Sequence, residues 1–239
     1  MKRTMIALCL VALFAASAVF VASASAAEAP TYKLCVAKKG GNYTKGCASE
    51  SAPGKGKAEL EEVEEPASFT GSGKKPTITI GSKKVSCKDA SVEGTIQYGD
   101  GSAGAHYTFT SCGLSKKEPC TTAGESSGTI KTLRLDTQLN YLNPGETELG
   151  ISAGLVGAPF AKFSCGAGEI EVKGEVEGTI ANGKKGTTVT YAVSGGTQEH
   201  DTAYLEGEEF TVGLEAGGEP VTLSATLTDG PKGVVAIGG

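Results

Sequence analysis

The chain has 239 residues, which is enough for one or two domains with a hydrophobic core. Hydrophobic residues make up 39% of the chain and charged residues 21%, a balance that excludes wholesale disorder. The formal net charge of −5 argues against a nucleic-acid partner, because nucleic-acid-binding proteins normally carry a basic patch.

Residues 1–26 have the layout of a secretory signal peptide. Two basic residues open the segment, an apolar run follows, and residues 24–26 read Ala-Ser-Ala, which fits a cleavage site. We expect the mature chain to begin at Ala27 or Glu28, to be secreted outside the cell or into the cell envelope, and to contain no membrane span. The alternative is an uncleaved membrane anchor, but the apolar run has only 18 residues, the lower limit for a span.

Six cysteines follow the predicted signal peptide: Cys35, Cys47, Cys87, Cys112, Cys120 and Cys165. An even number of cysteines behind a signal peptide indicates disulfide bonds formed in an oxidising compartment. The alternative is zinc, which needs closely spaced cysteine pairs or nearby histidines. The chain has only two histidines. We therefore predict disulfides, no metal and no cofactor.

The sequence around the cysteines favours the pairs Cys35–Cys47, Cys112–Cys120 and Cys87–Cys165. The first pair flanks a glycine-rich turn, and the second brackets a short loop that contains glycine and proline. The third pair lies in two segments of similar sequence, Val-Ser-Cys and Phe-Ser-Cys, which we interpret as equivalent strands.

The beginning of the mature chain divides into two segments of different composition. Residues 27–50 form a small N-terminal disulfide unit, which we interpret as a hairpin closed by the first disulfide. Residues 51–76 contain the acidic run Glu59–Glu65, and we interpret them as a solvated linker or an exposed edge segment. One turn of helix that ends at Pro66 is the alternative.

Residues 77–239 show alternation of apolar and polar side chains, the pattern of half-buried strands. On one segment Glu169, Glu171, Lys173, Glu175 and Glu177 share the polar parity. The side chains that we expect to be buried share the apolar parity: Ile170, Val172, Val176, Ile180, Val189, Tyr191, Phe210, Val212, Leu223 and Leu227. One apolar and one polar face per strand predicts an all-β domain of antiparallel strands, either a sandwich or a barrel.

A short sequence echo connects two parts of this β region. Val92–Ile96 reads Val-Glu-Gly-Thr-Ile and returns as Val176–Ile180, 84 positions later, and the same offset matches Tyr107 with Tyr191. Both copies read as a strand, a glycine-rich turn and a second strand. A duplicated hairpin explains the echo, and chance within a shared β-strand vocabulary is the alternative.

Several short motifs occur in a fixed order between residues 32 and 180: Cys35-Val36-Ala37-Lys38, Gly41-Asn42-Tyr43, Gly46-Cys47, Val85-Ser86-Cys87-Lys88, Phe109-Thr110-Ser111-Cys112, Pro119-Cys120-Thr121 and Ala161-Lys162-Phe163-Ser164-Cys165. This order resembles an uncharacterised family of secreted bacterial β-rich proteins, in which a short Cys…Gly-x-Tyr…Cys unit precedes a Gly/Thr-rich β region. The resemblance implies secretion and a β fold, and it transfers no activity.

The sequence contains no complete catalytic motif, so we predict no catalytic residue. We expect a non-enzymatic binding, adhesion or cell-envelope module with an extracellular or cell-surface ligand. The alternative is a secreted hydrolase that acts on glycans or other polymers through a pair of glutamates. The candidates for such a pair lie among Glu169, Glu171, Glu175 and Glu177, which we interpret instead as a solvated sheet face.

Overall fold

The computed structural model describes residues 28–47, 49–97, 101–166, 168–183, 186–229 and 234–237. The described residues form strands and no helix, which confirms the all-β prediction. Within these ranges no helix is long and apolar enough to cross a membrane. The predicted signal peptide, residues 1–26, lies outside the described residues.

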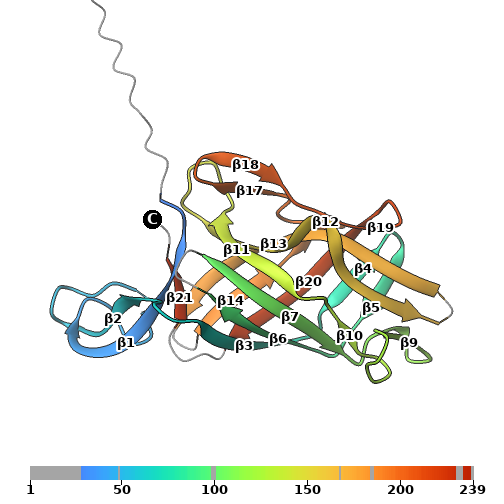
Figure 1. Cartoon of the computed structure of the whole chain (residues 1–239), viewed down its shortest axis with the longest axis horizontal. Coiled ribbons are helices and arrows are strands. Elements are labelled where there is room, and N and C mark those ends of the chain that lie inside the picture. The colour runs from blue at the N-terminus through green and yellow to red at the C-terminus, as the bar shows by residue number, and fades with distance from the viewer. Residues whose placement is uncertain are drawn as a thin grey trace, which may run out of the picture.

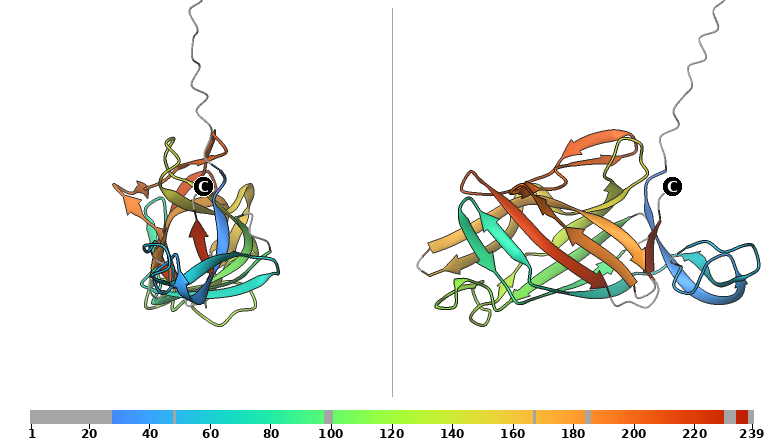
Figure 2. Two further views of the ribbon diagram at one scale, coloured as in Figure 1. Left: turned by 90° about the vertical axis from the view of Figure 1, so that its left-hand side faces the viewer. Right: turned by 180° about the vertical axis from the view of Figure 1, so that it is seen from behind.

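Eight antiparallel strands close into a first barrel, which decides between the two predicted architectures. Their pairings run in a ring, β13-β12-β11-β7-β6-β3-β20-β14, and β14 pairs back with β13. The strands are β3 (Ala67–Lys74), β6 (Asp89–Ile96), β7 (Ser102–Thr110), β11 (Leu135–Tyr141), β12 (Leu149–Cys165), β13 (Gly168–Gly183), β14 (Gly186–Tyr191) and β20 (Glu219–Asp229). Closure leaves this ring without a free strand edge. Seen along the long axis, the strands surround a common interior (Figure 2, left).

A second ring of pairings continues from the end of the first. It adds β4 (Thr77–Ile80), β5 (Lys83–Ser86), β8 (Gly113–Ser115), β9 (Glu118–Thr121) and β19 (Leu214–Ala216). The order is β20-β4-β5-β8-β9-β12-β13-β19, and β19 returns to β20. The strands β12, β13 and β20 run through both rings, which explains their lengths of 17, 16 and 11 residues. The added strands that Figure 1 labels, β4, β5, β9 and β19, lie at the right-hand end of the view.

A three-stranded sheet lies at the opposite end of the molecule (Figure 1). Its order is β2 (Gly56–Glu62), β1 (Thr31–Gly41) and β21 (Val234–Ile237), so the described beginning and end of the chain pair with each other. The disulfide Cys35–Cys47 is present here, as predicted, with a Cα–Cα distance of 5.8 Å. The strand that completes this disulfide hairpin with β1 is β2, so the hairpin extends beyond the predicted residues 27–50.

Residues 51–76 contain two strands in place of the predicted linker. The strand β2 forms the edge of the three-stranded sheet, which agrees with the edge alternative for this part. The strand β3 instead lies between β20 and β6 in the first barrel. The acidic run makes this segment resemble a solvated linker. In the structure Glu61 and Glu62 are exposed to solvent, while Ala58 and Val63, beside and between the glutamates, are buried.

The two remaining disulfides join different cysteines from those that we predicted. The structure links Cys87 to Cys112 and Cys120 to Cys165, so the predicted pairs Cys112–Cys120 and Cys87–Cys165 are wrong. The reason is strand register. Asp89 is paired with Thr110 in the β6–β7 hairpin, and continuing this register by two positions places Cys87 opposite Cys112. The other two cysteines form a direct residue pair between β9 and β12.

These two disulfides reinforce two joins of the second ring that have few residue pairs. The strands β5 and β8 share a single residue pair, Ser86 with Gly113, and the Cys87–Cys112 bond lies immediately beside it. The strands β9 and β12 share two residue pairs, one of which is the Cys120–Cys165 disulfide itself. Covalent bonds therefore hold the ring where few backbone hydrogen bonds do.

The remaining strands are short. The strand β10 (Ile130–Lys131) pairs with β7, and the strands β15 (Val193–Ser194) and β16 (Thr197–Gln198) pair with each other. The hairpin of β17 (Thr202–Leu205) and β18 (Glu208–Thr211) contacts β11 and lies at the top of Figure 1.

The alternating pattern predicts most of the core correctly. Seven of the ten expected side chains are buried: Val172, Val176, Ile180, Tyr191, Val212, Leu223 and Leu227. The other three, Ile170, Val189 and Phe210, are partly exposed. Phe210 is partly exposed because its strand, β18, belongs to the outlying hairpin and to neither barrel ring.

Candidate functional site

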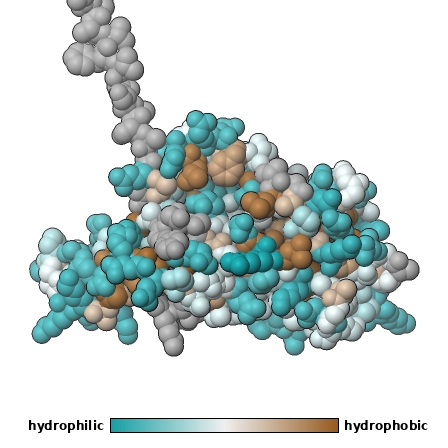
Figure 3. All heavy atoms as spheres, viewed as in Figure 1, coloured by the Kyte–Doolittle hydropathy of each residue, from teal (hydrophilic) through white to brown (hydrophobic). Residues whose placement is uncertain are grey.

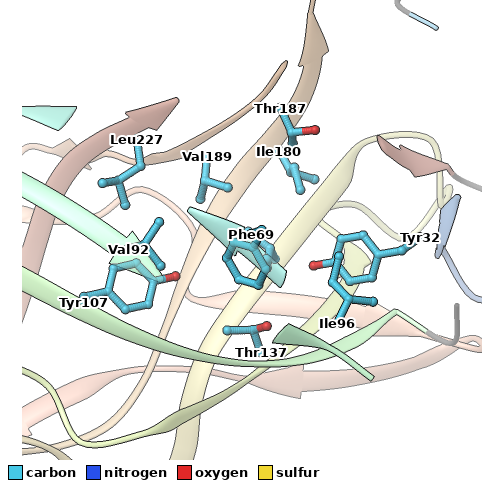
Figure 4. A pocket seen from close by; sticks show the side chains of 11 residues that line it. Tyr32, Phe69, Val92, Ile96, Tyr107, Thr137, Ile180, Thr187, Val189 and Leu227 are labelled. Atoms are coloured by element: carbon cyan, nitrogen blue, oxygen red, sulfur yellow. The ribbon is translucent and has the colours of Figure 1, made fainter. Parts of the chain in front are cut away.

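An apolar cavity of about 50 Å³ lies inside the first barrel (Figure 4). The side chains that line it come from every strand of the ring and from β1: Tyr32, Phe69, Val92, Ile96, Tyr107, Thr137, Ile151, Ile180, Thr187, Val189 and Leu227. Successive side chains of a strand point to opposite faces, so closure of the sheet directs one parity of each strand to the barrel interior. The cavity is therefore a consequence of ring closure.

Tyr32 occupies one end of this cavity from outside the ring. It belongs to β1, which pairs with β2 and β21 and, within the described ranges, with no strand of the barrel. The side chain of Tyr32 is nevertheless buried, and Figure 4 shows its hydroxyl directed toward Phe69 in the middle of the cavity. The space left in the barrel thus depends on the position of one side chain from a separate sheet.

Two tyrosines meet inside the barrel from opposite sides of the ring. The hydroxyl oxygens of Tyr107 on β7 and Tyr191 on β14 are 2.7 Å apart, and their rings pack edge to face with centroids 6.1 Å apart. Burial raises the pKa of Tyr107 to about 12 and also raises the pKa of Tyr191, so both hydroxyls keep their protons at neutral pH. In Figure 4 the hydroxyl of Tyr107 points into the cavity.

The two threonines of the cavity wall use their hydroxyl protons within the chain. The hydroxyl of Thr137 donates to the carbonyl oxygen of Ala103 at 3.2 Å, and the hydroxyl of Thr187 donates to Oδ1 of Asn182 at 3.3 Å. The rest of the wall is mostly hydrocarbon. Such a surface favours an apolar occupant. A polar group that enters the cavity gives up its hydrogen bonds to water and finds few hydrogen-bonding partners to replace them.

The glutamates of β13 divide into an exposed and a buried pair. Glu169 and Glu171 are in contact with solvent and form ion pairs with Lys162 at 3.1 Å and Lys173 at 3.5 Å. This agrees with the predicted solvated face. For Glu175 and Glu177 the prediction is wrong, because the side chain of Glu177 is completely buried and that of Glu175 is nearly so.

The chain between β14 and β20 explains this burial. It crosses the outer face of β13, where the carbonyl oxygen of Gly213 accepts a hydrogen bond from the backbone N–H of Glu175. Gly174 adopts φ +103°, and a Cβ there would collide with the same carbonyl, so glycine permits this close approach. A cavity of about 200 Å³ remains beneath the crossing segment, lined in part by Glu175, Glu177 and His200.

Hydrogen bonds hold Glu177 in place. Nδ2 of Asn140 donates to one carboxyl oxygen at 2.8 Å, and the backbone N–H of Gly178 donates to the other at 3.2 Å. Burial raises the pKa of Glu177 to about 8, against the lowering effect of these two donors. The pKa of Glu175 is raised as well, because burial outweighs its hydrogen bond to Ser152. Gly150 makes room for this arrangement, since a Cβ there would collide with Oδ1 of Asn140.

The hydrolase alternative requires a pair of glutamates that is available to a substrate, so the contacts of the β13 glutamates test it. The buried Glu177 is engaged by Asn140 and Gly178, and the two exposed glutamates are engaged by lysines. A surface groove of about 640 Å³ includes Glu169, Glu171, Glu215 and Glu219. Across the described ranges, no group of three His, Cys, Asp or Glu side chains is arranged to hold a metal ion.

Comparison with protein-family models, with curated proteins and with solved structures finds no match for this chain. The site therefore has to be interpreted from its own residues. Sequence reasoning missed the cavity, although two signals pointed to it. Tyr107 and Tyr191 both carry the apolar parity of their strands, and the sequence echo relates the hairpins that bring them together.

Proposed function

We propose that this chain is a secreted, non-enzymatic binding module that holds a small apolar ligand inside its first barrel. The apolar cavity is the observation that carries the proposal. The three disulfides are consistent with an extracellular protein, and the predicted signal peptide supports export. A role in the cell envelope is compatible with the same activity.

The outer surface supports a buried binding site. The face seen in Figure 3 is mainly hydrophilic, and its hydrophobic side chains lie in small separate groups. Apolar side chains gather instead inside the barrel, around the cavity of Figure 4. A small apolar molecule would gain more by entering the barrel than by adsorbing on this face.

Tyr32 sets the size of the ligand. An engineered protein cavity of about 150 Å³ binds benzene, so the 50 Å³ left beside Tyr32 accommodates only a smaller group. Among the described residues β1 pairs with β2 and β21, so a displacement of the Tyr32 side chain leaves the strand pairings of the ring unchanged. We infer that a ligand of benzene size or larger displaces this side chain.

Benzene titration of three proteins tests the proposal. The readout is the NMR shift of the methyl groups of Ile96, Ile151 and Ile180, which line the cavity. Benzene should shift these methyls more strongly in Tyr32→Ala than in wild type, because the variant enlarges the cavity. Val92→Phe, which fills the cavity, should abolish the shifts.

The second barrel supplies the control. Ile78 and Val85 are buried outside this cavity, and their methyl signals should stay in place during the titration. Absence of any benzene-dependent shift in both wild type and Tyr32→Ala would refute a ligand site in the first barrel. Equal shifts in both barrels would indicate general partitioning of benzene and would refute it too.

A further inference from the structure

The hydroxyls of Tyr107 and Tyr191 carry two protons, but the hydrogen bond between them uses only one. Among the described residues, the hydrogen bonding of the two hydroxyls consists of this mutual contact. The second O–H donor of this buried pair therefore has no acceptor in the described part of the chain. Buried donors of this kind are rare in folded proteins, so this one calls for an explanation.

The geometry decides which of the two hydroxyls presents the second proton to a ligand. Tyr107 lines the apolar cavity, whereas Tyr191 is not among its lining residues. Either oxygen can act as the donor in their mutual bond. When Tyr191 donates to Tyr107, the proton of Tyr107 is free to point into the cavity, where Figure 4 shows its hydroxyl.

Among the described residues, the hydroxyl of Tyr107 hydrogen-bonds to that of Tyr191 alone. Among the cavity residues, the hydroxyls of Thr137 and Thr187 hydrogen-bond to Ala103 and Asn182, and neither contacts Tyr107 through its side-chain oxygen. The backbone N–H of Tyr107 is satisfied separately by Oγ1 of Thr132. An acceptor for the hydroxyl proton has to come from whatever occupies the cavity.

We propose that the ligand of the first barrel is a small apolar molecule with one hydrogen-bond acceptor oxygen, such as a ketone or ether, which binds to the hydroxyl of Tyr107. The ligand then completes a chain in which Tyr191 donates to Tyr107 and Tyr107 donates to the ligand oxygen. Such a chain strengthens each of its hydrogen bonds through mutual polarisation. This inference rests on the proposed function, because it names the ligand class of the same cavity.

A matched pair of probes separates the hydrogen bond from apolar burial. Cyclohexanone and methylenecyclohexane have almost the same shape, and only the ketone has an acceptor oxygen. Affinities are measured by methyl NMR in the Tyr32→Ala background, which provides the space. Tyr32→Leu, which keeps more apolar surface, takes its place if Tyr32→Ala does not fold.

The readout is the ratio of the two affinities, ketone over alkene, compared among Tyr→Phe variants. Tyr107→Phe removes the proposed donor and should lower this ratio about fivefold, the effect of losing one ordinary hydrogen bond. Tyr191→Phe removes the same mutual hydrogen bond but leaves the hydroxyl of Tyr107, so the ratio should fall much less than in Tyr107→Phe, by only the loss of mutual polarisation. A merely structural role for the pair would affect both variants alike.

Three results would each overturn a different statement. An unchanged ratio in Tyr107→Phe, with both probes still bound, would refute the acceptor inference and leave the apolar cavity function standing. Failure of both probes to bind to the Tyr32→Ala protein, in which the cavity is enlarged, would refute the proposed function itself. A ratio that falls equally in Tyr191→Phe would also overturn the assignment of the donor to Tyr107.

Discussion

Glu177 should make the stability of this protein decrease as the pH rises from about 5 to 8. Its side chain is completely buried, and its pKa is about 8 in the folded protein against 4.5 for an ordinary glutamate. The folded state therefore holds a proton that the unfolded state releases near pH 4.5. The stabilisation from this proton is complete below pH 4.5 and is lost as the pH rises through the folded pKa.

The size of the effect follows from the pKa difference. Each pKa unit corresponds to about 1.4 kcal/mol, so the shift of Glu177 predicts a loss of roughly 5 kcal/mol in the free energy of unfolding over the whole titration, of which roughly 3–4 kcal/mol falls between pH 5 and 8. That loss is comparable to the whole stability of many small domains, typically about 5–15 kcal/mol. Glu175, whose pKa is also raised, adds to the loss in the same direction.

The variant Glu177→Gln isolates this contribution. Glutamine stays neutral, and rotation of the Asn140 amide lets its Oδ1 accept a hydrogen bond from the new amide. In the native protein this Oδ1 is buried and has no hydrogen-bond partner among the described residues. We expect urea unfolding of Glu177→Gln to show a much smaller decrease in free energy between pH 5 and 8 than wild type, the remainder coming from Glu175, with higher stability than wild type at pH 8.

Glu171→Gln is the matched control, because Glu171 lies on the same strand but is partly exposed and forms an ion pair with Lys173. Its unfolding free energy should follow the wild-type pH profile. A Glu177→Gln profile that parallels wild type over this range would refute the assignment of the buried proton to Glu177.

Three further predictions concern the framework. Replacing both Cys120 and Cys165 with alanine should lower the free energy of unfolding by roughly 4 kcal/mol, because this disulfide closes a loop between cysteines 45 residues apart. Chemical denaturation measures the change, and unchanged stability would contradict the role of this disulfide in the second ring. Leu223→Ala should cost about 2–5 kcal/mol because this side chain is buried, whereas Thr226→Ala on the exposed side of β20 should cost less than about 0.5 kcal/mol. Equal costs would disprove the one-sided strand. Mass spectrometry of the exported protein should find an N-terminus at residue 27 or 28, and an intact leader would contradict cleavage.

Local patterns in the sequence predicted what depends on neighbouring residues. Strand alternation predicted the all-β fold and most of the buried side chains, since side-chain direction is a local property of a strand. The pair Cys35–Cys47 was predictable for the same reason, because a short glycine-rich segment connects its cysteines. The pair Cys87–Cys112 was within reach too. Both cysteines are equally far in sequence from the glycine-rich turn predicted between Val92–Ile96 and Tyr107. Extending the register of that hairpin to its open end pairs them.

Features that depend on distant pairings were not predictable in this way. Glu177 is buried because the segment between β14 and β20 covers this part of β13. The residues near Glu177 in the sequence do not predict that this distant segment lies there. Closure of the barrel requires β20 to pair with both β3 and β14, which lie far from each other along the chain. The cavity exists only after this closure, and Tyr32 reaches it from a separate sheet.

Intermolecular NOEs between methylenecyclohexane bound to Tyr32→Ala and the protein methyl groups would test the central claim most directly. The proposed site predicts NOEs to Ile96, Ile151 and Ile180, which line the cavity of the first barrel. It predicts none to Val85 or Val172, which are buried elsewhere in the core. NOEs to the latter pair, or no NOEs at a saturating probe concentration, would contradict a ligand site inside the first barrel.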